Sequence, residues 1–538
     1  MIKSSIKYSL FFVLLGVLIF SSCAKRGSIT GGLKDSLAPV LVKAYPENFS
    51  TGFKNNKIEI EFNELIKIKD INSQLIISPP LKYKPIVEPQ SAASKKITIT
   101  IKDTLKENTT YSFNFGQSIT DNNEGNPYNQ FKYVVSTGTY IDSLSLVGQI
   151  KDAFNQKSDN FVSIHLYDAE TFTDSTIYKE QPLYVTNTLD SLTYFGLENL
   201  RKGNYKIIAL KDKNNNGKYD PKSDKIGFLK ETIHVPSDTL YQLELFKENS
   251  IVKASALTQE SKNKWFLGYE GDKTNLKISA NTNKINIPLK ILPYSDTKKD
   301  SIQLFLPILT AEDSIVFKIE NRLFKKEYSR KIKDLKTIDS LQIDAIKPKY
   351  NNFNDAFEMY ATTPIKSIDV SKISIIDKDS LMINFNHKLD TLKNSLSILF
   401  EKKETEKYSI LVEPNAFVDY NNTTNDSLNF KINTRKFNDY GNLTVVPLNG
   451  SNFPYILEVI KDKDIVVATA IITENKAITF NLIEPNAYTL RIIEDENKNN
   501  VWDTGNYQLK KQAERVIYFP KPVDIRANWD VEQIFDIR

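Results

Sequence analysis

The chain has 538 residues, 40% hydrophobic and 25% charged, which is enough apolar material for several folded domains. Its 71 Lys and Arg residues are interspersed with 66 Asp and Glu residues, and a formal charge of +5 without basic blocks argues against nucleic-acid binding. The only cysteine, Cys23, excludes a disulfide framework and a cysteine-based zinc site.

Residues 1–22 have the composition of a secretory signal peptide. Lys3 and Lys7 give a basic start, and residues 10–20 form an uninterrupted apolar run. This run is too short to cross a bilayer, which needs about 20 apolar residues, but it suits a signal peptide. Removal of Lys3 and Lys7 lowers the formal charge from +5 to +3.

Ser21, Ser22 and Cys23 follow this run and resemble the lipobox of bacterial lipoproteins, although Phe20 departs from the usual aliphatic residue. The resemblance implies cleavage before Cys23 and attachment of diacylglycerol to its thiol. Acyl chains on one cysteine bury enough methylene groups to hold a protein on a membrane. The alternative is an ordinary secretory signal that leaves an unpaired thiol.

The residues after Cys23 bear on where such a lipoprotein goes. Ala24 stands where lipoproteins retained at the inner membrane often carry Asp, so the resemblance implies the outer membrane. Lys25 and Arg26 are basic, unlike the acidic tags of some surface-exported lipoproteins, which favours the periplasmic face over the cell surface.

Beyond a polar tether, alternation of apolar and polar residues dominates the chain. Period-2 strands separated by turn clusters, with no long amphipathic helix, predict an all-β protein built from tandem antiparallel sandwiches. The expected strands are residues 57–62, 96–102, 111–115, 132–136, 163–168, 206–210, 276–279, 301–306, 314–319, 381–385, 428–432 and 489–493.

One segment occurs twice. Residues 203–220 match residues 486–503 without a gap, and Gly203 and Gly217 are replaced by Asn486 and Asn500. Asn tolerates the left-handed backbone conformation best after glycine, so both replacements are expected to preserve local geometry. A weaker pair joins residues 58–63 with residues 381–386, which suggests a two-domain cassette used twice.

These patterns predict seven segments along the chain. In order they are a signal peptide (1–22), a lipidated tether (23–37), an Ig-like domain (38–138), a smaller β domain (139–247), a β-rich domain of uncertain type (248–345), a second Ig-like domain (346–438) and a second smaller β domain (439–538).

Residues 35–138 resemble a bacterial Ig-like domain of the SbsA type. The resemblance rests on Asp35, Ala38, Pro39 and Pro46, the strand 58–64, residues 105–111, Asp121, Gly125, Asn126 and the closing residues 136–138. Residues 374–434 keep only part of the pattern. Such domains serve as spacers and adhesive modules and share no catalytic residues.

The repeated block resembles a transthyretin-like or CnaB-like β domain through Gly203 and Tyr205, a Gly-x-Tyr entering a strand. Gly203 is expected to make a tight turn and Tyr205 to bury its ring.

The repeated loops are candidate calcium sites. Asp212, Asn214, Asn216 and Asp220 fall at positions 1, 3, 5 and 9 of an EF-hand-like loop, although Ser223 stands where a bidentate Glu is expected and Asp224 follows it. The second copy offers Asp495, Asn497, Asn499 and Asp503. The alternative is a structural turn, because Asn and Asp side chains cap turns without a metal. No cofactor is otherwise required.

Other candidate sites are weaker. His165, His234 and His387 lie in no paired arrangement, and no nucleophile elbow or phosphate loop is present, so we expect no enzyme activity. Trp265, Phe266 and Tyr269 form either a stacking platform for sugar or part of a sandwich core.

The sequence thus favours a non-enzymatic scaffold, anchored to the outer membrane by lipid, that meets an unidentified envelope protein or glycan. The alternatives are a glycan- or peptidoglycan-binding lipoprotein, which exposed Trp265 and Tyr269 would favour, and a hydrolase accessory module, which needs a concave site.

Overall fold

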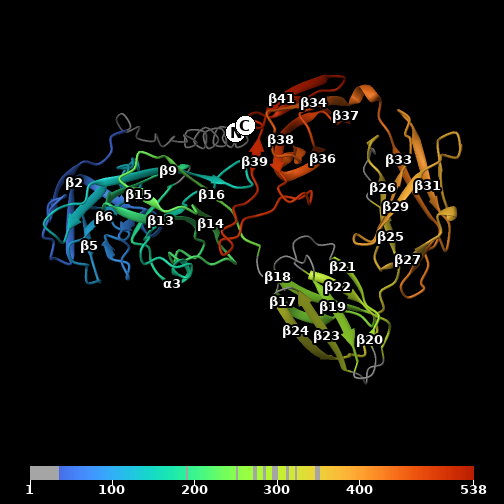
Figure 1. Ribbon diagram of the computed structural model, residues 1–538, viewed down its shortest axis with the longest axis horizontal. Coiled ribbons are helices and arrows are strands. Elements are labelled where there is room, and N and C mark those ends of the chain that lie inside the picture. Colours follow the sequence, from blue (N-terminus) through green and yellow to red (C-terminus); the bar gives the residue numbers. More distant parts are fainter. Residues whose placement is uncertain are drawn as a thin grey trace, which may run out of the picture. The chain divides into compact units, whose positions relative to one another are not determined.

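The computed structural model describes residues 35–189, 192–249, 253–270, 276–282, 286–293, 301–309, 314–321, 324–345 and 352–538 (Figure 1). Cys23 and the expected signal peptide lie outside the described residues. Among the described residues nearly every element is a strand, and the α-helices are only α2 (Ile71–Gln74) and α3 (Thr176–Lys179). The all-β prediction is confirmed.

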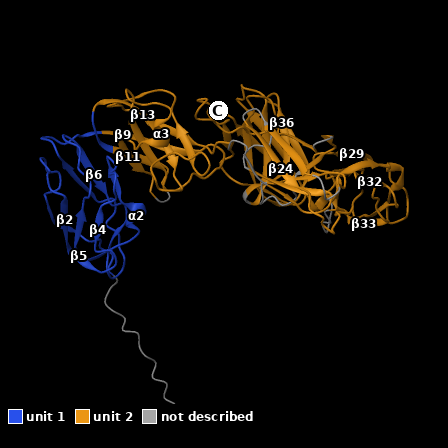
Figure 2. Cartoon of the chain, turned by 90° about the horizontal axis from the view of Figure 1, so that it is seen from below, with its two compact units in different colours: residues 1–144, 198–201 blue, residues 145–197, 202–538 orange. Residues whose placement is uncertain are grey.

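The chain divides into two compact units, coloured separately in Figure 2: residues 1–144 with 198–201, and residues 145–197 with 202–538. The first unit is a sandwich of one sheet in the order β1-β2-β5-β4, with β7 on β2, and a second in the order β3-β6-β8. Phe62, Phe113 and Phe115 fill its core. Its strands are β1 (Leu41–Tyr45), β2 (Lys57–Ile68), β3 (Ile76–Ser78), β4 (Ile86–Glu88), β5 (Ser94–Thr100), β6 (Thr110–Asn114), β7 (Ile119–Asp121) and β8 (Lys132–Ser136).

The first repeat lies in a sandwich whose larger sheet has the order β11-β10-β13-β14, with β15 on β13. The smaller sheet, β12-β9-β16, contains a parallel pair of β9 and β16. The strands are β9 (Leu144–Asp152), β10 (Ser163–Asp168), β11 (Tyr184–Asn187), β12 (Tyr194–Leu200), β13 (Gly203–Lys211), β14 (Lys225–Phe228), β15 (Ile233–Val235) and β16 (Tyr241–Leu245).

The second repeat has the same plan. Its sheets run β36-β35-β38-β39, with β40 on β38, and β37-β34-β41, where β34 and β41 are parallel. Three 3₁₀ turns also lie in this half of the chain. The elements are η1 (Val370–Lys372), η2 (Phe437–Asp439), η3 (Asp462–Asp464), β34 (Gly441–Leu448), β35 (Tyr455–Lys461), β36 (Ile465–Ile472), β37 (Ile478–Ile483), β38 (Asn486–Glu494), β39 (Val516–Tyr518), β40 (Val523–Ile525) and β41 (Asp530–Asp536).

Strand register shows that the repeats are structural equivalents. Ile208 faces Phe228 across β13 and β14, and Arg491 faces Tyr518 across β38 and β39. The expectation for Gly217 and Asn500 is also confirmed, because their φ angles are 68° and 63°, both left-handed.

The expected tight turn at Gly203 is not found, although Gly203 and Asn486 do share the same local geometry. Gly203 opens β13 and Asn486 opens β38 as ordinary strand residues, and neither has the positive φ of a tight turn. An added Cβ at Gly203 would lie 3.2 Å from the Tyr205 hydroxyl, yet the second repeat has Asn486 beside the buried Tyr488 at the same positions. Burial of the Tyr205 ring is confirmed, with 4% of the residue exposed.

Two further sandwiches lie between the repeats. One pairs the sheet β17-β18-β22-β21 with the sheet β20-β19-β23-β24, and the next combines β25-β26-β30-β29 with β28-β31-β33 and the pair β27-β32. Their strands are β17 (Lys253–Gln259), β18 (Lys264–Glu270), β19 (Lys277–Asn281), β20 (Asn286–Ile287), β21 (Lys290–Pro293), β22 (Ser301–Phe305), β23 (Ser314–Asn321), β24 (Phe324–Lys331), β25 (Ile343–Ala345), β26 (Phe357–Ala361), β27 (Ile365–Ile368), β28 (Ile373–Ile376), β29 (Asn386–Asp390), β30 (Ser395–Leu399), β31 (Lys407–Val412), β32 (Phe417–Asp419) and β33 (Leu428–Asn433).

The strand expected at residues 381–385 is absent. Leu381 and Met382 are 60% and 70% exposed, and the segment makes only a single bridge from Met382 to Ile376 before β29 begins. Its alternating pattern has no neighbouring strand to pair with along its length, so its match to residues 58–63 does not reflect equivalent strands. The boundaries predicted for the domains remain predictions.

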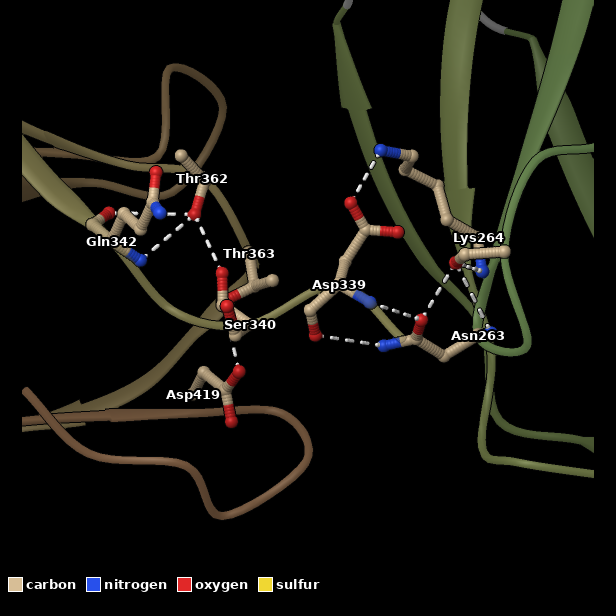
Figure 3. A network of polar contacts seen from close by, with 9 residues as sticks. Asn263, Lys264, Asp339, Ser340, Gln342, Thr362, Thr363 and Asp419 are labelled. Carbon is tan, nitrogen blue, oxygen red and sulfur yellow. Dashed lines mark hydrogen bonds and ion pairs between the residues drawn. The ribbon is translucent and has the colours of Figure 1, made fainter. Parts of the chain in front are cut away.

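Polar contacts fix the segment that joins these two sandwiches (Figure 3). Lys264 Nζ lies 2.6 Å from a carboxylate oxygen of Asp339, whose backbone N–H donates to Asn263 Oδ1 at 3.1 Å. On the other side, Thr362 Oγ1 donates to the Ser340 carbonyl at 3.0 Å. Consecutive residues of the connection are therefore bonded to different sandwiches.

A buried lysine gives this part of the chain a predicted pH dependence. Lys402 is 6% exposed and donates to the carbonyls of Phe353 and Asp355 at 3.2 and 2.6 Å. Burial lowers the pKa of Lys402 to about 8, against an opposing effect of Asp355. Between about pH 8 and the ordinary lysine value, the unfolded chain therefore holds a proton that the folded chain has lost, and stability rises with pH.

We expect the calorimetric unfolding temperature of this sandwich to rise, relative to that of Lys402→Met, when the pH is taken from about 7.5 to 9.5. Equal changes of the unfolding temperature in the two proteins would show that burial does not lower the pKa of Lys402.

Candidate functional site

The first repeated loop leaves β13 at Asp212, whose two carboxylate oxygens both accept backbone hydrogen bonds. Oδ1 accepts from Asn214 N at 3.0 Å and Oδ2 from Gly217 N at 2.7 Å. Asn216 Oδ1 and Asp220 Oδ1 likewise accept from the N–H groups two residues ahead, at 2.8 and 3.0 Å. The three bonds that span two residues are those of Asx turns, and the bond from Gly217 closes the loop across five. Side-chain oxygens alone therefore explain how the loop closes.

The second loop brings its expected ligands closer together. Asp495 accepts from Asn499 N at 3.0 Å and from Asn500 N at 2.9 Å. The side-chain amides of Asn497 and Asn499 both donate to Asp503 Oδ2, the latter at 2.9 Å. Rotation of either amide would place an oxygen beside the Asp503 carboxylate, which is the hard-oxygen set that Ca²⁺ favours.

Each loop is closed by a buried acid that follows it. Asp224, which is fully buried, accepts from Lys213 N at 3.0 Å and from Asp220 N at 2.8 Å. Glu514, 1% exposed, accepts from the equivalent N–H groups of Glu496 and Asp503 at 3.0 and 2.8 Å. Both acids therefore tie the second loop residue to the ninth.

Glu514 lies among other acids of its loop. Burial raises the pKa of the Glu514 carboxyl above its ordinary value, the N–H groups of Asp503 and Glu496 oppose this, and the charges of Asp503 and Asp495 add to it. A cation near Asp495 and Asp503 would offset this repulsion. Within the residues that the structure describes, no group of three or more His, Cys, Asp and Glu side chains is placed to hold a metal ion.

The histidines are not brought together. His165 lies in β10 and is 1% exposed, and burial lowers its pKa to about 4. Its Nδ1 lies 3.3 Å from the Tyr167 hydroxyl, and His234 Nδ1 meets Asn204 Oδ1. His387 is in the edge strand β29. The three histidines therefore lie on three different strands and form no common site.

The aromatic group at Trp265 belongs to a core. Trp265 is 3% exposed, with its ring centroid 5.2 Å from that of Phe317, and Tyr269 is 7% exposed. Neither ring can stack on a sugar from this position, so of the two alternatives the sandwich core is confirmed and the sugar platform is excluded. Their burial follows from the alternation of β18, which turns both side chains towards the opposite sheet.

A cleft of about 560 Å³ lies against the second repeat, lined by residues of β36 and β37 and by Asn354 and Asp355. Its carboxylate Glu484 lies 3.6 Å from Arg435 and 3.7 Å from Lys461. Glu484 is therefore paired with two cations and links residues 435 and 461 electrostatically.

Sequence reasoning missed Glu514. It lies seven residues later than the position equivalent to Asp224, so an ungapped comparison of the repeats does not find it. Alignment of β14 with β39, rather than of the loops alone, would have supplied the signal.

Comparison with known proteins places the first sandwich in a family. Residues 35–137, about a fifth of the chain, match the family model of the bacterial Ig-like domain. The tandem β-sandwich fold is therefore of the Ig-like kind. No curated protein matches the chain.

Solved structures with matching segments include surface layer protein SbsC, domains 1–6, which is 9% identical; the match covers 91% of this chain and 67% of that one, with a TM-score of 0.16. The I9–I11 tandem of titin is 7% identical over 53% of this chain and all of that one, with a TM-score of 0.13. The four N-terminal Ig domains of Dscam1 are 12% identical over 75% of this chain and all of that one, with a TM-score of 0.12.

Calcium binding at the loops remains a prediction with a direct test. We expect isothermal titration to show saturable Ca²⁺ binding that Asp212→Ala removes at the first loop and Asp503→Ala removes at the second, because each substitution deletes a carboxylate ligand. Asp168→Ala, at the other end of the first repeat's sheet, is the control. Titration heats equal to the buffer blank in the unsubstituted protein would contradict calcium binding, and the loops would then be structural Asx turns.

Proposed function

We propose that this protein is a non-enzymatic lipoprotein that is anchored by Cys23 to the outer membrane, on its periplasmic face, and acts as a scaffold in the cell envelope. The observation that carries the proposal is the succession of Ig-like sandwiches, beginning twelve residues after Cys23 with a bacterial Ig-like domain. Modules with separate cores keep an interaction surface away from the lipid without needing a catalytic centre.

The cores support a structural or interaction role. Three sandwiches have their own clusters of buried side chains, within residues 53–135, 257–332 and 341–432. Burial of Trp265 and Tyr269 removes the feature that favoured a glycan-binding lipoprotein. The partner in this proposal is therefore an envelope protein, met through the faces or edges of the sandwiches.

The anchor in this proposal is lipid. No helix among the described residues is long and apolar enough to span a bilayer. Each buried methylene group contributes about 0.8 kcal/mol, so a diacylglycerol group with an additional acyl chain exceeds the two lipid signals that stable anchoring needs.

Replacement of the anchoring residue tests the proposal. We expect Cys23→Ser to abolish incorporation of labelled palmitate and to move the protein from the detergent phase to the aqueous phase in phase separation, because no thiol remains to be acylated. Ser28→Ala, beyond the lipobox, should behave as the unsubstituted protein.

Sucrose-gradient fractions and proteolysis of intact cells then separate the outer membrane from the inner, and the periplasmic face from the cell surface. Palmitate incorporation into Cys23→Ser at the unsubstituted level would overturn the anchor. Recovery of the lipidated protein in inner-membrane fractions would overturn the location.

A further inference from the structure

The two repeats differ in length directly after the segment that matches without a gap. Asp220 and Asp224 are four positions apart, whereas their equivalents Asp503 and Glu514 are eleven apart. The offset between the repeats is 283 before this point and 290 after it, as the pairs β13–β14 and β38–β39 show. We call residues 504–513, which contain the seven additional residues, the tongue.

The tongue is buried against the first repeat through one aromatic side chain. Tyr507 is 1% exposed and belongs to the same core cluster as Phe228, Phe246 and Tyr219. Its ring stands perpendicular to that of Phe228, at 5.3 Å between centroids. The approach is close, since a Cβ added at Gly505 would lie 2.5 Å from the Phe246 ring.

Polar contacts surround this ring. Tyr507 N donates to Glu248 Oε1 at 2.5 Å, while Glu248 Oε2 accepts from the Tyr219 hydroxyl at 2.7 Å. Gln512 Nε2 donates to the Phe228 carbonyl at 2.8 Å. At the margin, Lys510 Nζ lies 2.6 Å from Asp174 and 3.6 Å from the centre of the Tyr507 ring.

A second contact joins the first repeat to the sheet of the second. Phe154, which follows β9, lies with its ring 4.6 Å from the Trp502 ring and 4.2 Å from the Arg491 guanidinium group. Tyr518 donates its hydroxyl proton to the Phe154 carbonyl at 2.9 Å. Arg491 is itself bonded to Glu458, at 2.7 Å from its Nε, so its charge is paired within the contact.

Both repeats use the same face for these contacts. Leu210, Ile226 and Phe228 lie in the cluster that receives the tongue. Their equivalents at the offsets above are Ile493, Val516 and Tyr518, which lie in the cluster that receives Phe154. The strands β13 and β38 accordingly have the same burial pattern, with four successive buried residues near the end of each.

We propose that the two repeats form an intramolecular pseudo-dimer, in which the tongue of the second repeat packs on the outer sheet face of the first. Equivalent faces of duplicated modules then take part in one interface, as in the subunits of a symmetric dimer. The partner of this face is thus the chain's own second repeat. The two sandwiches between the repeats are then connected at both ends to the paired repeats.

Intramolecular cross-linking of the full mature chain tests the pairing. In a Cys23→Ser background, Asp174→Cys and Lys510→Cys place two thiols at the margin of the tongue. We expect a short bismaleimide to join them rapidly, because docking gives the thiols a high effective concentration. The ring deletion Tyr507→Ala should slow the cross-link by about tenfold or more.

Tyr507→Phe is the matched control. Among the described residues the Tyr507 hydroxyl is buried without a hydrogen-bond partner, so its removal should leave the cross-linking rate unchanged or faster. Gly505→Ala deletes nothing from either repeat but introduces the clash with Phe246, and it should slow the reaction as Tyr507→Ala does.

A cross-linking rate that neither Tyr507→Ala nor Gly505→Ala changes would overturn the proposal. So would the absence of a cross-link in the parent protein, which carries only the two cysteine substitutions and Cys23→Ser. If Tyr507→Ala fails to fold, as judged by circular dichroism, Gly505→Ala alone decides the outcome.

Discussion

Side chains on every strand alternate between two faces, so an apolar face leaves water only when a second sheet covers it. In this chain that requirement is met within each sandwich, by clusters such as the one that holds Phe62, Phe113 and Phe115. Separate clusters contain Trp265 with Phe317, and Phe357 with Phe430. Because these cores share no residues, the sandwiches are modules, and the connections between them can be held by polar contacts such as those of Asp339.

The repeats depart from this rule in an informative way. An antiparallel sheet with one face in water shows alternation, whereas β13 and β38 are buried on both faces towards their ends. The run Ile207, Ile208, Ala209 and Leu210 has no polar residue to turn towards solvent. A sheet with such a central strand needs a cover on its outer face. In the first repeat this cover comes from α3 and its neighbours together with Tyr507, and in the second it includes Phe154 of the first repeat.

How far the sequence predicts the structure follows from the range of each interaction. Alternation is local, so the strands β2, β5, β6 and β8 are found where the pattern indicates them. Pairing is not local, and residues 381–385 alternate without becoming a strand because almost no neighbour pairs with them. For the same reason Trp265 could not be assigned to a core or a surface from its spacing alone.

The loops show the same limit at a finer scale. Asp212 and Asp495 could be identified from spacing, because their carboxylates accept from backbone N–H groups only two to five positions further along the chain. Glu514 could not be identified in this way, since it accepts from Asp503, eleven residues earlier. Glu248 is harder still to identify, since it accepts from Tyr507, 259 residues later. Both are acids that a local pattern cannot separate from the many exposed ones.

An insertion between Asp503 and Glu514 is tolerated because both ends of the tongue are already fixed. Glu514 holds the backbone of Asp503 and Glu496, so the added residues extend from a closed loop without displacing β39 from β38. A loop anchored in this way loses less conformational entropy when it docks. The geometry that closes a turn in the first repeat thus becomes, in the second, the base from which Tyr507 reaches the first.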